Sequence, residues 1–312
     1  MTPSVIVRPI DAVPPAARRA MIAVQRREAW SAYALLAPYL VAFLAFMVVP
    51  SSYGLFLSFT DFRLGIAHPH WTGLSNFAYV LTDPLFRTTV TNTIVFVLES
   101  TPALIVIPLA LAVVLNQRLP FRAFFRGAFF LPFTLSVTVV SICWWWLLDP
   151  NFGPVYFYLK ELGLHPRSWI STPALAMAAV VIATVWWTAG YNMVLFLAGL
   201  QEIPFHLYEA ARIDGAGGWR QFWTVTLPLL RPTTLFVIVI QLIASFQVFG
   251  QVYVMTNGGP GNGTRTVIQY VYETAFVQLQ MSEGAAAAWV LFVMILAFSL
   301  AQFKLLSGHT EY

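Results

Sequence analysis

Residues 201–232 read QEIPFHLYEAARIDGAGGWRQFWTVTLPLLRP, and this stretch decides the fold because it connects two long apolar segments. Proline is well tolerated in the first turn of a helix, so Pro204 predicts a helix that begins beside it. Glycine readily takes the left-handed conformation that ends many helices, so Asp214-Gly215 predicts where that helix stops. Between these points apolar side chains recur at a spacing of four, which indicates a single apolar stripe. The stripe consists of Ile203, Leu207, Ala210 and Ala211.

A second short helix is expected after the glycine turn, from Trp219 to about Thr226. Pro228 and Pro232 follow it and are expected to break the chain before the next apolar segment. So short a loop cannot bury all of its aromatic side chains, which are Trp219, Phe222 and Trp223. The residues alone leave two interpretations open. The loop either lies on lipid headgroups or docks against a partner protein.

The segments on both sides of this loop are long enough to cross a membrane. About 20 mostly apolar residues span the hydrocarbon layer, and six stretches of the chain meet that length. They lie at about residues 31–57, 90–115, 127–148, 174–199, 233–256 and 285–306. Only 10% of the residues are charged, against about 25% in soluble domains. We therefore expect an all-α polytopic membrane protein, with a tail at 1–30, a transmembrane domain at 31–306 and a second tail at 307–312.

Lys and Arg are distributed unevenly between the two sides of these spans. Cytoplasmic connections carry the excess of basic residues in membrane proteins. Of the 17 Lys and Arg residues, twelve fall on the side of the two termini and the 201–232 loop. These are Arg8, Arg18, Arg19, Arg26, Arg27, Arg118, Arg122, Arg126, Arg212, Arg220, Arg231 and Lys304. The pattern predicts cytoplasmic termini, a cytoplasmic 201–232 loop and a 257–284 connection on the outside.

The same loop resembles a known motif. The run Glu209-Ala210-Ala211-x-x-Asp214-Gly215-Ala216, followed by Phe222, Leu227-Pro228 and Pro232, is similar to the EAA loop of bacterial ABC-importer permease subunits. In that family the loop forms the coupling helices that sit in a cleft of the ATP-hydrolysing subunit. The resemblance implies a type I ABC-importer permease fold with six transmembrane helices in the cytoplasmic membrane. It also implies that Glu209, Asp214 and Gly215 shape the loop, with Ala210, Ala211 and Ala216 at its tip, and that Phe222 and Trp223 fill the docking cleft.

Other segments resemble one branch of this family, the carbohydrate permeases related to the maltose and glycerol-3-phosphate systems. The matching segments include Pro50, Ser58-Phe59-Thr60-Asp61, Phe130-Leu131-Pro132 and Met255-Thr256-Asn257-Gly258-Gly259-Pro260. The resemblance implies a carbohydrate or related solute: a disaccharide or oligosaccharide, an amino sugar or a glycerol-phosphate compound. It further implies a second homologous permease, an ATPase dimer that binds ATP and Mg, and an extracytoplasmic solute-binding protein. One departure is at Phe249-Gly250-Gln251, where the family often has an acidic residue.

The sequence lacks the motifs that would make this chain an enzyme by itself. No Gly-Lys pair occurs, so there is no phosphate-binding loop of the G-x-x-x-x-G-K-[ST] type, and ATP must be hydrolysed by a partner. No nucleophile elbow or paired acidic site is present. His68-Pro69-His70 has no carboxylate or cysteine at metal-ligand spacing and is interpreted as an outer loop. The glycine-rich stretch at 257–263 is interpreted as a turn, with contact to an external binding protein as the alternative. We expect no cofactor, no metal and no nucleic-acid partner.

Polar residues inside the spans are the candidates for the solute pathway. Glu99 is the only ionisable residue deep in a span, and an intramembrane carboxylate suggests a function. It could bond to a neighbouring helix, line the pathway or carry protons, and the last possibility would make the chain a proton-coupled secondary carrier. Polar side chains in membrane helices serve packing as often as transport. The tentative pathway residues are Glu99, Asn192, Gln241 and Ser245.

Overall fold

The computed structural model describes residues 30–63, 69–117, 119–163 and 167–307, and all structural statements refer to this part of the chain. It divides into two units, residues 1–56 and 57–312, which are described separately. The arginines of the N-terminal tail, His68, Arg118 and residues 308–312 lie outside the described residues. The predictions made for them are therefore not addressed by the structure.

The first unit contributes one apolar helix. A continuous helical stretch runs over Trp30–Ser58 and is long and apolar enough to cross a membrane. It contains the π-helical turn η2 (Leu44–Val48) and then α2 (Val49–Ser58). Pro50 lacks the N–H that would bond the carbonyl four residues earlier, and π-turns are one of the ways in which helices accommodate such a gap. This helix corresponds to the span predicted at 31–57.

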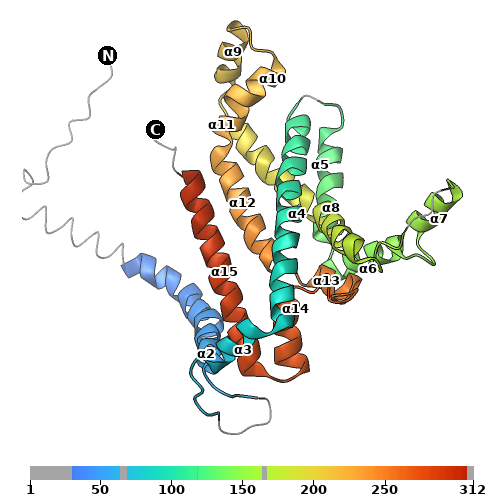
Figure 1. Ribbon diagram of the computed structural model, residues 1–312. Helices are drawn as coiled ribbons and strands as arrows, with labels where there is room; N and C mark the ends of the chain where they lie inside the picture. The colour runs from blue at the N-terminus through green and yellow to red at the C-terminus, as the bar shows by residue number, and fades with distance from the viewer. Residues whose placement is uncertain (1–29, 64–68, 118, 164–166, 308–312) are drawn as a thin grey trace, which may run out of the picture. The chain divides into compact units, whose positions relative to one another are not determined.

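The second unit is also helical, and its described residues contain only one isolated β-bridge, between Thr60 and Trp71. Four of its helices are long: α4 (Pro84–Leu115), α8 (Pro173–Glu202), α12 (Arg231–Phe246) and α15 (Met281–Ser307). The shorter elements are α3 (Ser75–Thr82), α5 (Arg122–Phe130), η3 (Leu131–Thr134), α6 (Val137–Leu148), α7 (Pro154–Glu161), α9 (Phe205–Ile213), α10 (Gly218–Gln221), η4 (Phe222–Thr226), α11 (Leu227–Leu229), α13 (Gly250–Met255), α14 (Val267–Tyr272) and η5 (Glu273–Val277). Figure 1 shows α4, α12 and α15 running roughly side by side.

Two predicted spans are not single straight helices. The segment predicted at 127–148 is divided between α5 with η3 and α6, which meet at an angle of 98°. The bend lies at Leu135 and Ser136, which are extended, and the Ser136 hydroxyl caps α6 by accepting a bond from the Val139 N–H. The segment predicted at 233–256 also divides, because α12 ends at Phe246 and α13 begins at Gly250. Periodicity of apolar residues could not locate these breaks, since both sides of each break are apolar.

The start of α4 also lies earlier than the predicted boundary at residue 90. Asp83 is its N-cap, and its carboxylate accepts a bond of 2.8 Å from the Leu85 N–H, with Pro84 in the first turn. Asp followed by Pro is a recognised signal for the start of a helix. Four helices qualify alone as membrane spans. Up to six spans result if two bent helix pairs each count as one span, namely Arg122–Thr134 with Val137–Leu148 and Gly218–Leu229 with Arg231–Phe246. The six-span expectation is compatible with the second count.

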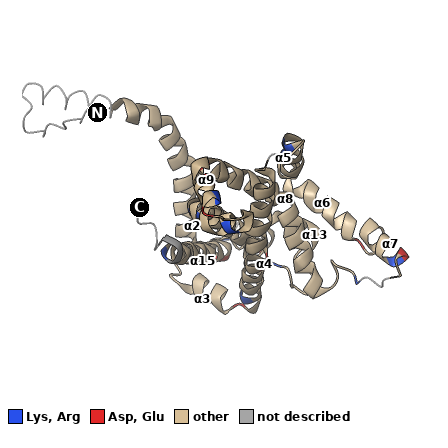
Figure 2. Cartoon of the chain, turned by 90° about the horizontal axis from the view of Figure 1, so that it is seen from above, with Lys and Arg blue, Asp and Glu red and all other residues tan. Residues whose placement is uncertain are grey.

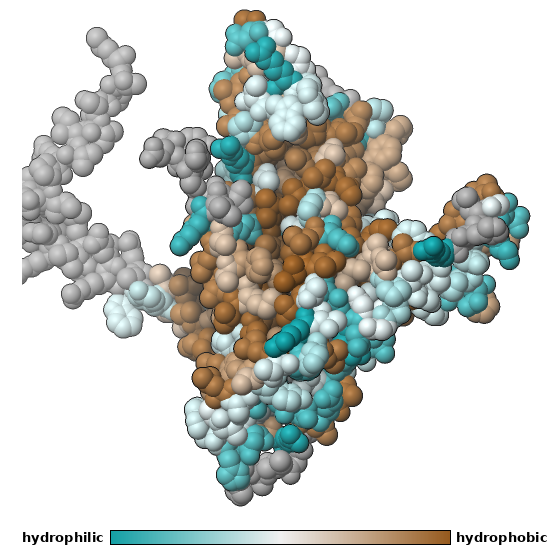
Figure 3. Space-filling model, viewed as in Figure 1, coloured by the Kyte–Doolittle hydropathy of each residue, from teal (hydrophilic) through white to brown (hydrophobic). Residues whose placement is uncertain are grey.

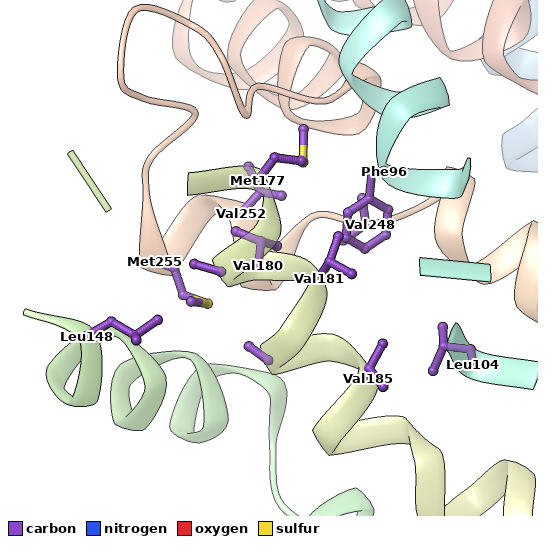
Figure 4. Close-up of a cluster of buried hydrophobic side chains, with 12 residues drawn as sticks. Phe96, Leu104, Leu148, Met177, Val180, Val181, Val185, Val248, Val252 and Met255 are labelled. Carbon is purple, nitrogen blue, oxygen red and sulfur yellow. The ribbon is translucent and has the colours of Figure 1, made fainter. Parts of the chain in front are cut away.

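The core of the second unit forms where α8 packs along α4. Figure 4 shows one cluster of buried side chains, in which Phe96 and Leu104 of α4 approach Val181 and Val185 of α8. Leu148 of α6 and residues of α13 complete this cluster. Gly190 allows a second close approach, because a Cβ atom there would overlap the backbone of Phe129. The end of α5 is thereby held against the middle of α8.

Polar residues concentrate at the ends of the second unit. Figure 3 shows a hydrophobic zone over the long helices, with hydrophilic side chains around the α9–α10 end and at the opposite end. Figure 2 looks onto the α9 end and shows basic residues there and on α5, while the helices behind are mostly uncharged. This distribution is the one expected of a protein that crosses the hydrocarbon layer.

Candidate functional site

The 201–232 loop folds as two short helical segments around a tight turn. α9 ends at Asp214, and Gly215 takes a φ of +76°, as its sequence position predicted. The Ala216 N–H donates to the Ala211 carbonyl over 2.8 Å and closes the turn. No atom lies within 4 Å of the place where a Cβ of Gly215 would be, so backbone conformation rather than space requires glycine here.

The apolar stripe of α9 is rotated slightly from the predicted one. Ile203, Leu207 and Ala211 are half-buried as expected, whereas Ala210 is exposed. Tyr208 takes its place on the inner side, and its hydroxyl lies 3.0 Å from the Thr226 hydroxyl of η4. On the other side of the turn, the Gln221 side-chain amide donates to the Ala216 carbonyl over 2.6 Å.

These bonds connect the two halves of the loop, and sequence reasoning did not find them. The helical path after the turn is also longer than predicted, because Pro228 lies within α11 and the chain bends by 66° at Leu230. The π-turn η4 immediately before α11 accommodates the missing N–H of that proline.

The aromatic side chains of the loop form one cluster. Trp219, Phe222 and Trp223 have ring centroids 5.5–6.0 Å apart. Trp219 is 75% exposed and Trp223 is 52% exposed, whereas Phe222 is half-buried. Glu209, Asp214 and Ile213 are exposed as well. The prediction that the loop cannot bury all of its aromatics is confirmed, and its outer surface presents apolar side chains beside charged ones.

A cavity of about 740 Å³ lies between this loop and the ends of α4 and α8. Val113 contributes from α4, Asn116 and Gln117 contribute from the residues just after it, and Leu200 contributes from α8. Arg212 faces the cavity and lies 5.8 Å from the ring centroid of Phe205. The cavity thus separates part of the loop from the helix bundle. The loop is stabilised mainly by hydrogen bonds between its own residues.

A second cavity, of about 490 Å³, lies among the long helices. Its polar lining groups include Thr188, Gln241 and Ser245. One wall is aromatic: Phe133 of η3 stacks on Tyr191 of α8 at 4.6 Å and lies 5.9 Å from Trp187. Sequence reasoning did not identify Phe133 or Trp187, because their approach depends on the bend after η3.

A polar contact behind this cavity compensates for a proline within α4. Pro108 has no N–H, so the carbonyl of Leu104 loses its usual partner within α4. The buried side chain of Asn192 donates to that carbonyl over 2.8 Å. Its oxygen in turn accepts from the Gln241 amide over 2.8 Å. Asn192 therefore holds Gln241 in position.

The break between α12 and α13 brings further amides to the same cavity. A continuous helix would place Gln247 and Gln251 on a different face from Gln241 and Ser245. In the structure all four line one cavity, because the chain turns at Phe249. Ser245 also lies 3.2 Å from the hydroxyl of Ser100 on α4.

Glu99 does not join the other three predicted pathway residues. Asn192, Gln241 and Ser245 are buried and lie together, whereas Glu99 is exposed on α4 and is not among the residues that line the cavity. Within the described residues its carboxylate makes no hydrogen bond or ion pair.

At the opposite end of the unit, the glycine-rich stretch predicted as a turn is fastened to α4. The side-chain amide of Asn92 donates to the carbonyls of Asn262 and Arg265 over 2.7 and 3.0 Å. The Tyr270 hydroxyl donates to Asp83 over 2.7 Å, and burial together with this carboxylate raises the pKa of Tyr270. The turn is therefore an ordered part of this end of the unit, held to α4 by hydrogen bonds.

His70, in the segment interpreted as an outer loop, has one carboxylate neighbour in the structure. Asp61 accepts a bond from the His70 N–H, and its carboxylate lies 3.4 Å from Nδ1 of the ring. Mainly because of the bond from the backbone, the pKa of Asp61 is lowered.

The comparison with known proteins decides the family. Residues 85–306 match the family described as the inner membrane component of binding-protein-dependent transport systems. The chain belongs to this family. It is 33% identical to a probable ABC transporter permease protein of Pyrococcus horikoshii, over 84% of this chain and 94% of that protein. It is 32% identical to the sn-glycerol-3-phosphate transport system permease protein UgpA of Agrobacterium fabrum, over 90% and 96%.

Another relative is the arabinooligosaccharides transport system permease protein AraP of Bacillus subtilis, 35% identical over 88% of this chain and 87% of that one. Among solved structures, a bacterial ABC transporter involved in the import of the acidic polysaccharide alginate has a TM-score of 0.81. That alignment covers 94% of this permease and all of the other chain at 24% identity, so it shows the fold alone. The type I ABC-importer permease fold is confirmed, and the permease is a membrane transport component.

Proposed function

We propose that this permease carries a carbohydrate across the cytoplasmic membrane as one subunit of an ABC importer. The observation that carries the proposal is the cavity among α4, α8, α12 and α13. It combines amide and hydroxyl groups, which can bond sugar hydroxyls, with the aromatic wall of Phe133, Trp187 and Tyr191. Aromatic faces suit the apolar C–H surface of a sugar ring. The names of the relatives, which include an arabinooligosaccharide permease, support the same solute class.

An uncharged solute is favoured within this class. The described residues that line the cavity include no Lys, Arg or His. Recognition of a phosphate or carboxylate group usually relies on such cations. We therefore favour a neutral disaccharide or oligosaccharide over a glycerol-phosphate compound.

The energy is proposed to come from a separate ATPase subunit that binds ATP and Mg. The exposed rings of Trp219 and Trp223 and the exposed side chain of Ile213 offer apolar surface for docking at the end of the permease. In the proposed arrangement this end and both chain termini are cytoplasmic, as the distribution of Lys and Arg predicted. A second homologous permease completes the membrane part, and an extracytoplasmic protein delivers the solute. One solved relative of this fold was crystallised with an alginate pentasaccharide-bound periplasmic protein, which supports such a partner.

The test is to purify the tagged permease from its native membrane in mild detergent and to identify its partners by mass spectrometry. We expect a second six-span permease and a soluble ATPase at fixed stoichiometry. The accompanying solute-binding protein is then screened against neutral sugars and sn-glycerol 3-phosphate by calorimetry. A permease that transports while alone, or a binding protein selective for the phosphate ester, would contradict the corresponding part of the proposal.

A further inference from the structure

Glu99 occupies the middle of the longest membrane helix of the second unit. α4 spans Pro84–Leu115 and is apolar enough to cross the hydrocarbon layer. At 1.5 Å per residue, Glu99 lies about 23 Å from either helix end, and the hydrocarbon layer is about 30 Å thick. The carboxylate is therefore at the depth where an uncompensated charge is costly.

The surface around Glu99 is an exposed stripe along α4, defined by Thr91, Val95, Leu98, Glu99, Pro102 and Val106. Leu98 is 68% exposed and Val106 is 63% exposed, so the second unit leaves this stripe uncovered. Most of its side chains are apolar. A pathway for a hydrophilic solute needs polar groups, and the cavity that Phe96 also lines has such groups in Gln241 and Ser245.

Backbone chemistry gives a second reason to exclude lipid from this stripe. Pro102 lacks an N–H, so it withdraws the donor that would normally bond the carbonyl of Leu98. The backbone hydrogen bond lost at Pro108 is replaced inside the protein by the bond from the Asn192 side chain to the Leu104 carbonyl. At Pro102 the affected carbonyl lies on the exposed stripe beside Glu99. Weakened backbone bonding and a carboxylate at one depth are tolerated where another protein surface covers them.

The long helices of the second unit carry no basic residue near their middle, where Glu99 lies on α4. The helices α4, α8, α12 and α15 carry their Lys and Arg residues close to their ends, at Arg87, Arg231 and Lys304. The apolar helix Trp30–Ser58 contains no Lys, Arg or His. A counter-charge at this depth is therefore expected from a different chain.

We propose that the exposed stripe of α4 is the contact surface for the second permease subunit, and that Glu99 pairs there with a basic side chain of that subunit. This inference rests on the proposed function, because it requires that a second permease exists. Polar side chains are known to hold membrane helices together, and a single ion pair within an apolar interface also fixes the register of the two helices.

The position of the stripe is tested by photocross-linking in the complete complex. Leu98 is replaced by the photoreactive amino acid p-benzoylphenylalanine, and the same replacement at buried Phe96 is the matched control. We expect the probe at 98 to link to the second permease and the probe at 96 to link only within its own chain. Adducts of the probe at 98 with lipid alone, or with residues 30–56 of the same chain, would overturn the proposal.

The charge is tested by comparing Glu99→Gln with Glu99→Asp, and Glu161→Gln on the exposed surface of α7 is the control. We expect Glu99→Gln to lower the amount of second permease that co-purifies about fivefold, while the other two variants retain it. Equal recovery from all three would overturn the ion pair. If the unmodified permease recovers no second permease, the proposed function fails as well, so the two failures are distinguishable.

Discussion

At the scale of single residues, Asn192 connects the backbone carbonyl left unbonded by Pro108 with a side chain of the cavity wall. Its amide compensates the carbonyl freed by Pro108 and at the same time orients Gln241 at the cavity wall. The side chain is completely buried, so water cannot replace either bond. Asn192, which the sequence suggested for solute contact, thus bonds Gln241 and is not itself among the residues that line the cavity.

Asn192→Leu should destabilise the permease and also weaken transport. The substitution keeps the volume but leaves the Leu104 carbonyl and the Gln241 amide without partners, at a cost of about 1–3 kcal/mol for each buried group. The midpoint of thermal unfolding in detergent should fall, and uptake should fall with it. Asn151→Leu, at an exposed position, is the control. An unchanged midpoint for Asn192→Leu would show that these bonds do not contribute.

Gly215→Pro should abolish both solute-stimulated ATP hydrolysis and transport while leaving expression intact. Proline holds φ near −65°, which is incompatible with the +76° found at this turn. Expression should be retained, because the turn is exposed, while solute-stimulated ATP hydrolysis of the purified complex should be lost. Gly217→Ala is the matched control, since Gly217 has a φ of −67° and open space around it. If Gly215→Pro still transports, the coupling role of this turn is wrong.

At the scale of elements, the loop 201–232 behaves as a braced unit rather than as two independent turns. α9 and η4 are connected by the Tyr208–Thr226 hydroxyl pair, and the cavity beneath them leaves few other supports. An element that transmits force between subunits needs such internal stiffness. The sequence motif supplies the turn, whereas the brace is visible only after both segments are placed.

Tyr208→Phe should loosen this unit without unfolding the permease. Loss of one hydrogen bond of about 1 kcal/mol corresponds to about fivefold faster amide exchange in α9 and η4. Thr226→Val should have the same effect, and combining the two changes should add little, because they remove the same bond. Tyr158→Phe on α7, where the side chain is exposed, should leave this exchange unchanged. Additive effects of the two changes would contradict the brace.

At the scale of the whole molecule, the arrangement favours a subunit driven from outside over an autonomous carrier. Glu99, the residue on which a proton-coupled carrier would depend, lies apart from the cavity that holds the other polar groups. The family match and the full-length relatives likewise point to a transport system with several components.

Uptake by the complete system should therefore depend on ATP and not on the proton gradient. In proteoliposomes, transport should require ATP and Mg on the side of the ATPase and should continue when a protonophore collapses the gradient. The control is a complex that carries an inactivated ATPase subunit. Uptake that stops with the protonophore and continues without ATP would restore the carrier hypothesis.

Membrane class, the existence of the long helices, the loop 201–232 and its glycine turn follow from local sequence. The reason is that hydropathy over about 20 residues and the preference of glycine for positive φ are local properties. Family membership also follows, because the motif is contiguous.

Tertiary structure alone decided where α5–η3 bends into α6, where α12 gives way to α13, and which polar residues share a cavity. Gln247 and Gln251 line the same cavity as Gln241, whereas Glu99 does not. Phe133 stacks on Tyr191. These outcomes depend on the direction in which the chain leaves each helix and on contacts between residues far apart in sequence. Apolar periodicity carries no information on either, because apolar residues occur on both sides of each break.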